Sequence, residues 1–454
     1  MMPRRPGFAV PALLLLTLAG RPLAAAEIAI GHDDRVLVLA PHPDDETLGT
    51  GGVLQRAHAA GAAVRVAFLT YGDANELSFL VYRDRPVVMP EAVEAMGRRR
   101  HDEAVAAARV LGIEAPALVF LGYPDDGLLD VLMAHWGDDP PLQSVLTRVT
   151  AVPYASALRP HAPYKGEEIL RDLTAVLREF RPTQVFVSHA ADRHPDHCAT
   201  YLFTRVALWD LAGEMHPAVH PYLIHYPHWP ERRGLDETHP LAPPAALAAE
   251  IPWESSALTA ARRAVKLAAL RAHATQWSYN ADFLASFVRP LERFGDLPPL
   301  PVERQPPRTG TPVGGGAPPP AELTDEERAE FVGLEWRAVA LDGDALVVTT
   351  HLSRPLARAV TIGLDLLGYR PDVPFARMPK LRVRVDAFGH RARNGARSLP
   401  GDAVAVDRDL RDVTVRVPLA TLGRPRRVLV GARTSLARVA LDAVPWRVLE
   451  LPAP

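Results

Sequence analysis

Histidines and carboxylates gather in two short segments that lie far apart in the chain. The first is Pro41-His42-Pro43-Asp44-Asp45-Glu46-Thr47, and the second is His194-Pro195-Asp196-His197. Each segment closely follows a short hydrophobic run, at residues 36–40 and 185–188. Imidazole and carboxylate groups bind divalent metal ions and also transfer protons in hydrolysis. The two segments therefore predict metal-dependent acid–base chemistry, provided that the fold brings them together.

The spacing of these residues suggests a particular ligand set. His42 and Asp45 are three residues apart across a tight turn and could reach one cation, and His197 would complete a set of three. Three protein ligands with an open fourth position are typical of a catalytic zinc site rather than a structural one. A metal held in this way lowers the pKa of its bound water and polarises a substrate carbonyl. The same ligand types also suit other divalent metals of the first row.

The remaining residues of the two segments can be given roles in the same chemistry. Asp44 would take a proton from the metal-bound water as a general base. His194 would stabilise the oxyanion, kept cationic or oriented by Asp196. A single His-Pro-Asp segment is most often only a turn. Two such segments, each placed between a buried strand and a helix, instead predict a functional site.

Short hydrophobic runs alternate with helical periods over the first part of the chain. Strands are expected at residues 36–40, 64–69, 118–121 and 185–188, and helices at 48–60, 91–111, 167–180 and from 197 to about 211. A further helix is expected at about 257–275, capped by Ser255. This alternation predicts an α/β fold with a mostly parallel sheet covered by helices on both faces. Ligands in such sheets bind beyond the carboxyl ends of the strands, where the two polar segments are expected.

The composition changes beyond this region. Residues 294–321 are dense in proline and glycine, which predicts a linker. Several short β-rich runs follow, and they predict a C-terminal β-sandwich at residues 322–454. The α/β part would then occupy residues 29–293.

The N-terminus predicts export. Arg4 and Arg5 precede a mostly apolar run at residues 8–18, and small residues come just before Glu27. This pattern is typical of a secretory signal peptide at residues 1–26, so a periplasmic or secreted location is expected. An uncleaved membrane anchor is the alternative. No later stretch reaches the length of a membrane span, and the net charge of −2 gives no field that would attract nucleic acid.

The paired segments resemble the PIG-L/LmbE-like family of zinc-dependent N-deacetylases, and the resemblance covers roughly residues 35–275. Members of that family act on groups of the N-acetylglucosamine type. The resemblance implies a Rossmann-like fold, with zinc on His42, Asp45 and His197. It also implies that Asp44 is the base and that His194 stabilises the oxyanion.

Two further matches imply substrate contacts. In similar enzymes an arginine and an aspartate that correspond to Arg100 and Asp125 lie near the substrate. Residues 72–90 and 124–164 form long loops whose aromatic residues could stack on sugar rings or pack under the loops: Phe79, Tyr82, Trp136, Tyr154 and Tyr164. These loops and the C-terminal part lie outside the minimal family pattern, so they leave the exact substrate open.

The expected function is hydrolysis of an N-acetyl or other N-acyl group on an amino sugar or glycan. A zinc-dependent amidase acting on a non-sugar acyl group is one alternative, and a non-catalytic carbohydrate-binding protein is another. Asp44 argues against the binding protein, because a binding module needs no general base beside its metal.

Overall fold

The computed structural model describes residues 26–74, 89–304, 311–313, 319–320, 323–437 and 439–452. The expected signal peptide therefore lies outside the described residues, apart from Ala26, which belongs to a short strand. Phe79 and Tyr82 also lie outside them.

The first unit is built on an eight-stranded sheet with the order β1-β7-β8-β6-β5-β2-β3-β4. Five neighbouring strands run parallel: β6 (Ala218–Tyr222), β5 (Gln184–Ser188), β2 (Arg35–Ala40), β3 (Ala63–Phe68) and β4 (Leu118–Phe120). β8 (Leu291–Phe294) runs antiparallel to its neighbours β6 and β7 (Glu254–Ala257), and β1 (Ala26–Glu27) lies at the edge. The predicted, mostly parallel α/β sheet is confirmed.

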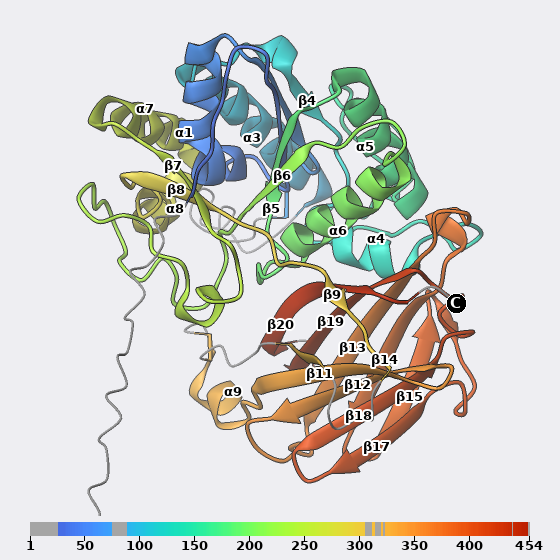
Figure 1. Ribbon diagram of the computed structural model, residues 1–454. Helices are drawn as coiled ribbons and strands as arrows, with labels where there is room; N and C mark the ends of the chain where they lie inside the picture. Colours follow the sequence, from blue (N-terminus) through green and yellow to red (C-terminus); the bar gives the residue numbers. More distant parts are fainter. Residues whose placement is uncertain are drawn as a thin grey trace, which may run out of the picture.

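Helices cover both faces of this sheet (Figure 1). One group comprises α1 (Asp45–Ala60), α3 (Pro90–Val110), α7 (Ala260–Ala272) and α8 (Ala274–Ala285). The other comprises α4 (Leu128–Ala134), α5 (Gly166–Phe180) and α6 (Pro195–Asp210). α5 shows why they pack: Ile169, Leu173, Val176, Leu177 and Phe180 are all buried. Their helical spacing places them on one apolar stripe.

The helix expected at about 257–275 begins later than predicted. Ser255 lies in strand β7, and the hydroxyl of Thr259 caps α7 by accepting a hydrogen bond from the backbone N–H of Arg262. The chain then bends at His273, and α8 continues to Ala285. Both Ser255 and Thr259 are good capping residues, so pairing of residues 254–257 with β8 decided between them.

The second unit is the predicted β-sandwich. Its five-stranded sheet contains β10 (Thr311–Val313), β11 (Leu334–Asp342), β12 (Ala345–Leu352), β18 (Asp412–Pro418) and β17 (Ala405–Asp409). Its seven-stranded sheet contains β16 (Arg397–Ser398), β15 (Gly389–Asn394), β14 (Lys380–Asp386), β13 (Val360–Tyr369), β19 (Arg427–Leu436), β20 (Val439–Glu450) and β9 (Leu300–Pro301). A short helix, α9 (Asp325–Ala329), precedes β11.

Part of the predicted linker belongs to the sandwich. β9 pairs with β20, and β10 pairs with β11. Both are short strands at a sheet edge and both contain proline, a residue that sheets tolerate at their edges. Proline content alone therefore could not separate linker from strand.

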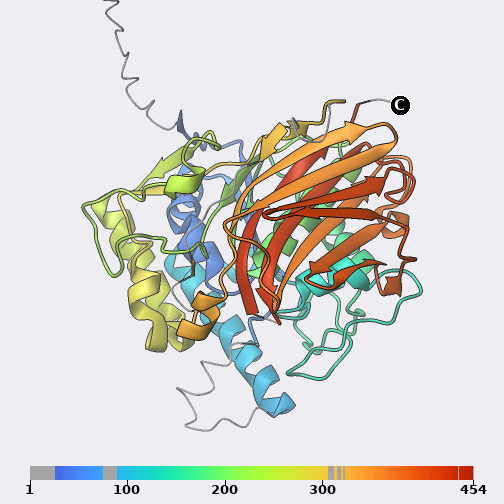
Figure 2. The same cartoon turned by 90° about the horizontal axis from the view of Figure 1, so that it is seen from below.

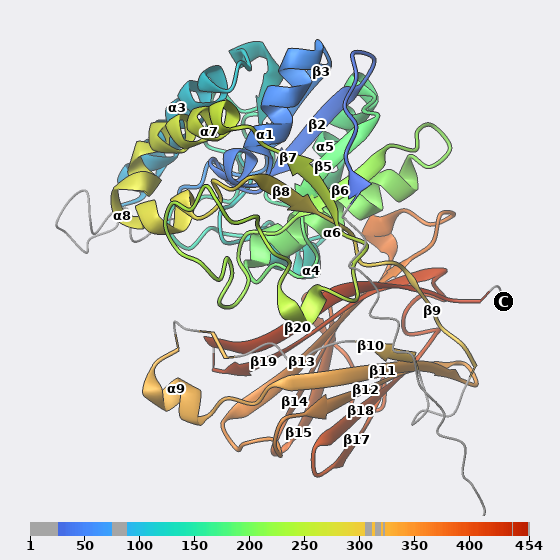
Figure 3. The same cartoon turned by 60° about the vertical axis from the view of Figure 1, so that its left-hand side comes forward.

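The hydrophobic core of the α/β unit extends into its contact with the sandwich, whose own core is a separate cluster. Leu367, Tyr369, Phe375 and Trp446 of the sandwich belong to the same buried cluster as the core of the α/β unit. Figures 2 and 3 show the seven-stranded sheet lying against the α/β unit, with β19 and β20 nearest to it. Within the described residues no helix is both long and apolar enough to cross a membrane.

Candidate active site

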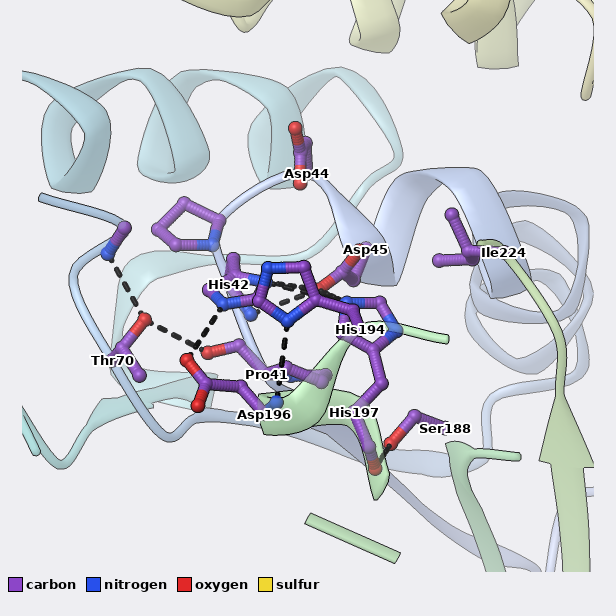
Figure 4. A network of polar contacts seen from close by, with 12 residues as sticks. Pro41, His42, Asp44, Asp45, Thr70, Ser188, His194, Asp196, His197 and Ile224 are labelled. Carbon is purple, nitrogen blue, oxygen red and sulfur yellow. Dashed lines mark hydrogen bonds and ion pairs between the residues drawn. The ribbon is translucent and has the colours of Figure 1, made fainter. Parts of the chain in front are cut away.

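Strand adjacency brings the two polar segments together. β2 and β5 are parallel neighbours, so residues 41–45 and 189–197 leave the sheet at the same edge. Figure 4 shows the side chains of His42, Asp45 and His197 converging there, with His194 beside them. The first segment turns directly into α1, and the second turns into α6, whose first residue is Pro195. Proline suits this position because its missing N–H is not needed in the first turn of a helix.

Three atoms of the expected ligand set lie close together. His42 Nδ1 is 3.2 Å from Asp45 Oδ2, His197 Nε2 is 3.2 Å from the same oxygen, and the two nitrogens are 3.3 Å apart. Ligand atoms around a tetrahedral zinc ion lie about 3.3 Å apart, because zinc–nitrogen bonds are about 2.0–2.1 Å long. The three atoms therefore fit one face of a zinc coordination tetrahedron.

Further carboxylates support these ligands from behind. Asp192 Oδ2 lies 3.1 Å from His197 Nδ1, and Asp125 Oδ1 and Asp196 Oδ2 lie 3.1 and 3.2 Å from His42 Nε2. In metal sites such partners orient the imidazole and increase its basicity. The family resemblance implies that Asp125 lies near the substrate. In the structure Asp125 contacts the ring of His42, one of the expected ligands, and lines the cavity beside it.

The buried charges favour a cation at this position. Burial lowers the pKa of His197, but the carboxylates of Asp192 and Asp45 outweigh it and raise that pKa to about 10. Burial likewise lowers the pKa of His42, which Asp125, Asp196 and Asp45 together raise well above its usual range. Both shifts report an excess of buried negative charge. Bound protons or a metal ion would offset this excess.

Asp44 stands apart from the ligand set (Figure 4). Its backbone has φ 123°, a left-handed conformation that is unusual for a residue other than glycine. Its backbone N–H donates to Glu46 Oε2 at 2.9 Å, and its carboxylate lies 3.5 Å from Arg100. Strained backbone of this kind is found at functional sites when the surroundings hold it in place. Here the turn directs the carboxylates of Asp44 and Asp45 to different sides (Figure 4).

Arg100 fixes the position of Asp44. It is 4% exposed and donates to the carbonyl oxygens of Gly72 and Pro43, each at 2.6 Å. The family resemblance implies that Arg100 lies near the substrate, and Arg100 does line the cavity. Its hydrogen bonds also tie it to the turn that carries His42 and Asp44.

Activity is expected to fall at low pH as Asp44 becomes protonated. Burial raises its pKa to about 7, although Arg100 opposes the shift. A base must be deprotonated to accept a proton, so activity should fall as the pH drops through this pKa. A bound dication would lower the value, which places the fall in activity at or below about pH 7. The measurement is kcat/KM against pH at saturating metal. A rate that does not fall as the pH is lowered from 8 to the acid limit of folding would contradict the role of Asp44 as the base.

Asp196 contacts His194, as one of the two predicted relations required, but it does so through its backbone. The carboxylate of Asp196 faces His42 and accepts hydrogen bonds from the backbone N–H groups of Asp126 and Leu128. Only the backbone N–H of Asp196 contacts His194, donating to its Nδ1 at 3.2 Å. Burial, together with the nearby His42 and His197, lowers the pKa of His194 well below its usual value. His194 is therefore oriented by the backbone of Asp196, and its burial beside other histidines favours the neutral imidazole.

The site opens into a cavity of about 640 Å³. Five of the predicted site residues line it: His42, Asp44, Arg100, Asp125 and His194. Its wall also includes residues for which no role in the site was predicted: Asp126, Asp130, Gln143, His225, Gln276, Tyr279, Asn280 and Phe283. Tyr279 and Phe283 lie on α8, beyond the predicted end of its helix. The ring centroid of His225 lies 4.8 Å from that of His197.

The described aromatic residues of the long loops have structural roles. Trp136, Tyr154 and Tyr164 are 5%, 3% and 1% exposed. The ring of Tyr154 stacks on Tyr71 with centroids 3.8 Å apart. Trp136 packs against Phe375 of the sandwich. Of the two roles that the sequence allowed for these three residues, the structure favours packing.

Comparison with known proteins agrees with this geometry. Residues 37–208 match the family model of PIG-L, described as GlcNAc-PI de-N-acetylase. The chain is 33% identical over 181 residues to a 1D-myo-inositol 2-acetamido-2-deoxy-alpha-D-glucopyranoside deacetylase of Mycobacterium sp. (strain KMS), covering 38% of this chain and 50% of that protein. The corresponding protein of Mycobacteroides abscessus is 28% identical over 267 residues, covering 55% of this chain and 83% of that one.

Among solved structures, an N,N'-diacetylchitobiose deacetylase from Pyrococcus horikoshii is 20% identical with a TM-score of 0.36, covering 58% of this chain and 83% of that one. The chain spans only half the length of the mycobacterial relative named first. The family model nevertheless covers both segments that supply the clustered histidines and carboxylates. Residues 37–208 of this chain are therefore similar to the PIG-L family over the part that holds both segments.

Proposed function

We propose that this protein is an exported, zinc-dependent hydrolase that removes N-acetyl groups from an N-acetylglucosamine-type sugar or glycoconjugate. The observation that carries the proposal is the position of His42 Nδ1, Asp45 Oδ2 and His197 Nε2, all within 3.3 Å of one another, beside a cavity that His42 and Asp45 line. Asp44 stands beside them as an acid outside the ligand set. Three ligands plus a free acid match the needs of metal-assisted amide hydrolysis.

Zinc bound at these three atoms would supply the Lewis acid that polarises the acyl carbonyl and activates a water molecule. The carboxylate of Asp44 accepts a proton from the attacking water, and Arg100 holds that carboxylate in place. The same proton then passes from Asp44 to the sugar nitrogen as the C–N bond breaks. The products are acetate and a free amine.

His194 stabilises the oxyanion in this mechanism. A neutral imidazole that accepts a hydrogen bond at Nδ1 carries its own proton on Nε2. Because the Asp196 N–H donates to Nδ1, His194 presents an Nε2–H donor, and the residue lines the cavity. A donor fixed before the reaction stabilises developing negative charge without a cost of reorientation.

The cavity supports a polar substrate of sugar size. A volume of about 640 Å³ lies within the usual range for small-molecule sites. Carboxylates and amides line it together with Tyr279 and Phe283, so hydroxyl groups would find partners and a ring face would find an aromatic surface. The mycobacterial relatives are named as deacetylases of an acetamido sugar, which supports the same substrate class. Export rests on the basic and apolar pattern of residues 1–26.

An acetate-release assay on the purified protein tests the proposal. Acetate should be released from N-acetylglucosamine, its oligomers or its inositol glycoside, and this release should depend on added zinc. N-acetylated amino acids of similar size serve as the comparison. Faster release from the amino acids would favour the non-sugar amidase. Zinc and sugar binding without acetate release from any N-acyl compound would identify a binding protein instead.

A further inference from the structure

The loop that supplies one side of the metal site is attached to the sandwich. Residues 189–194 connect β5 to α6 and lead directly to the ligand His197. The carbonyl oxygen of Ala190 accepts a hydrogen bond from the backbone N–H of Trp446 at 2.9 Å. Three residues further on, the guanidinium of Arg193 pairs with the Asp442 carboxylate at 2.9 Å. Strand β20 thus holds this loop at two points.

β20 is shaped for these contacts. Its register with β19 shifts between Val430 and Ala432, a bulge that interrupts regular pairing close to Trp446. The opposite edge of β20 pairs with β9 only at Leu449 and Glu450, so the edge near Trp446 is free to contact another element. Gly431 lets the Trp446 ring pack closely, since a Cβ there would lie 2.6 Å from the ring.

The side chain of Asp442 is buried, and both of its carboxylate oxygens accept hydrogen bonds. Its side chain is 1% exposed. One carboxylate oxygen accepts from Arg193, and the other accepts from the backbone N–H of Leu334 at 2.8 Å. A buried carboxylate with both oxygens engaged holds its partner in one position, because losing either partner leaves a buried charge unsatisfied.

The position of this loop sets the position of Asp192, which contacts the proposed ligand His197. Asp192 lies between Ala190 and Arg193, and its Oδ2 contacts His197 Nδ1. The same oxygen accepts from the backbone N–H of His225 at 3.0 Å, and the N–H of Arg193 donates to the His225 carbonyl at 2.7 Å. A shift of Arg193 would therefore move Asp192 and change the orientation of the His197 ring.

We propose that the C-terminal sandwich is part of the metal site, with Asp442 and Arg193 as positioning residues that hold the Asp192–His197 pair in its ligating geometry. This inference rests on the proposed function, because it assumes a metal at His42, Asp45 and His197. It assigns the sandwich a role in the hydrolase itself. Partners behind a ligating histidine commonly contribute 10- to 100-fold to metal affinity.

The test is the zinc affinity of the full-length Asp442→Asn variant, measured by competition with a chromophoric chelator. Asparagine keeps the size and the acceptor for the Leu334 N–H but removes the charge that holds Arg193. Zinc should bind roughly tenfold more weakly, and kcat/KM should fall at limiting zinc and largely recover at saturating zinc. Amide hydrogen exchange at residues 190–193 should become faster in the metal-free variant.

Glu250→Gln is the matched control. Glu250 forms the other 2.9 Å arginine–carboxylate pair between the units, with Arg447, and it lies outside the 189–194 loop. It should leave zinc affinity unchanged. Arg193→Gln should reproduce the effect of Asp442→Asn, and the double variant should bind zinc no more weakly than either single variant.

Lowered stability in Asp442→Asn and Arg193→Gln with wild-type zinc affinity would overturn the inference, because the pair would then serve only to dock the two units. Failure of the proposed function looks different: the wild-type protein itself would bind zinc without releasing acetate, while the affinity difference between variants would still be measurable.

Discussion

Replacing Asp44 by asparagine is expected to lower kcat by about 10²- to 10⁴-fold, the usual contribution of a general acid–base residue. Zinc content should stay at the wild-type level, because the ligand atoms belong to His42, Asp45 and His197. Asparagine also tolerates a positive φ better than most residues, so the strained turn at φ 123° should persist. The measurements are kcat in the acetate-release assay and zinc content by elemental analysis.

Asp126→Asn is a suitable control for this prediction. Asp126 lines the same cavity, but its contact with the cluster runs through its backbone N–H, which donates to Asp196. Its substitution should therefore have a much smaller effect on kcat. Equal losses in the two variants would indicate that cavity charge matters rather than a specific base, and full activity in Asp44→Asn would rule out Asp44 as the base.

Removal of the metal by a chelator is expected to abolish acetate release, and added zinc should restore it. The protein should also become less stable, because a ligand that binds only the folded state stabilises it by RT ln(1 + [L]/Kd). Free zinc at a thousand times its Kd corresponds to about 4 kcal/mol. The excess of buried carboxylates around His42 and His197 destabilises the folded protein when the metal is absent, which adds to the expected loss of stability. Thermal unfolding with and without zinc measures the difference.

His197→Ala separates a specific site from nonspecific zinc binding. The variant keeps the other clustered histidines but loses one of the three close ligand atoms. Its midpoint of unfolding should no longer rise with zinc. A rise equal to that of the wild type would show that zinc stabilises the protein somewhere else.

The grouping of the histidines and carboxylates was predictable from the sequence because it depends on residues that are close together in the chain. His42, Asp44 and Asp45 follow a buried strand within one tight turn, and the Pro195–His197 stretch forms the first turn of α6. Short spacing fixes which side chains can share a face whatever the rest of the chain does. Strand–helix alternation then implied a parallel sheet, and that topology places both segments at one edge.

Only the tertiary structure decided which groups contact the far side of the proposed ligands. Asp196 is two residues from His194 in the chain, yet its carboxylate turns to His42, because the backbone N–H groups of Asp126 and Leu128 hold it there. Asp125 reaches the same ring from another loop. The residue types alone could not predict that Asp196 and Asp125 both contact His42, because these contacts join segments far apart in the chain.

The position of the sandwich relative to the α/β unit likewise could not be predicted from the sequence. Its β-rich pattern predicted strands but could not show that the edge of β20 would meet the loop after β5, with Trp446 and Asp442 contacting Ala190 and Arg193. Hydrophobic periodicity specifies which face of an element is buried, and it does not specify the partner that buries it. That choice depends on the shapes and charges of surfaces that exist only once both units have folded.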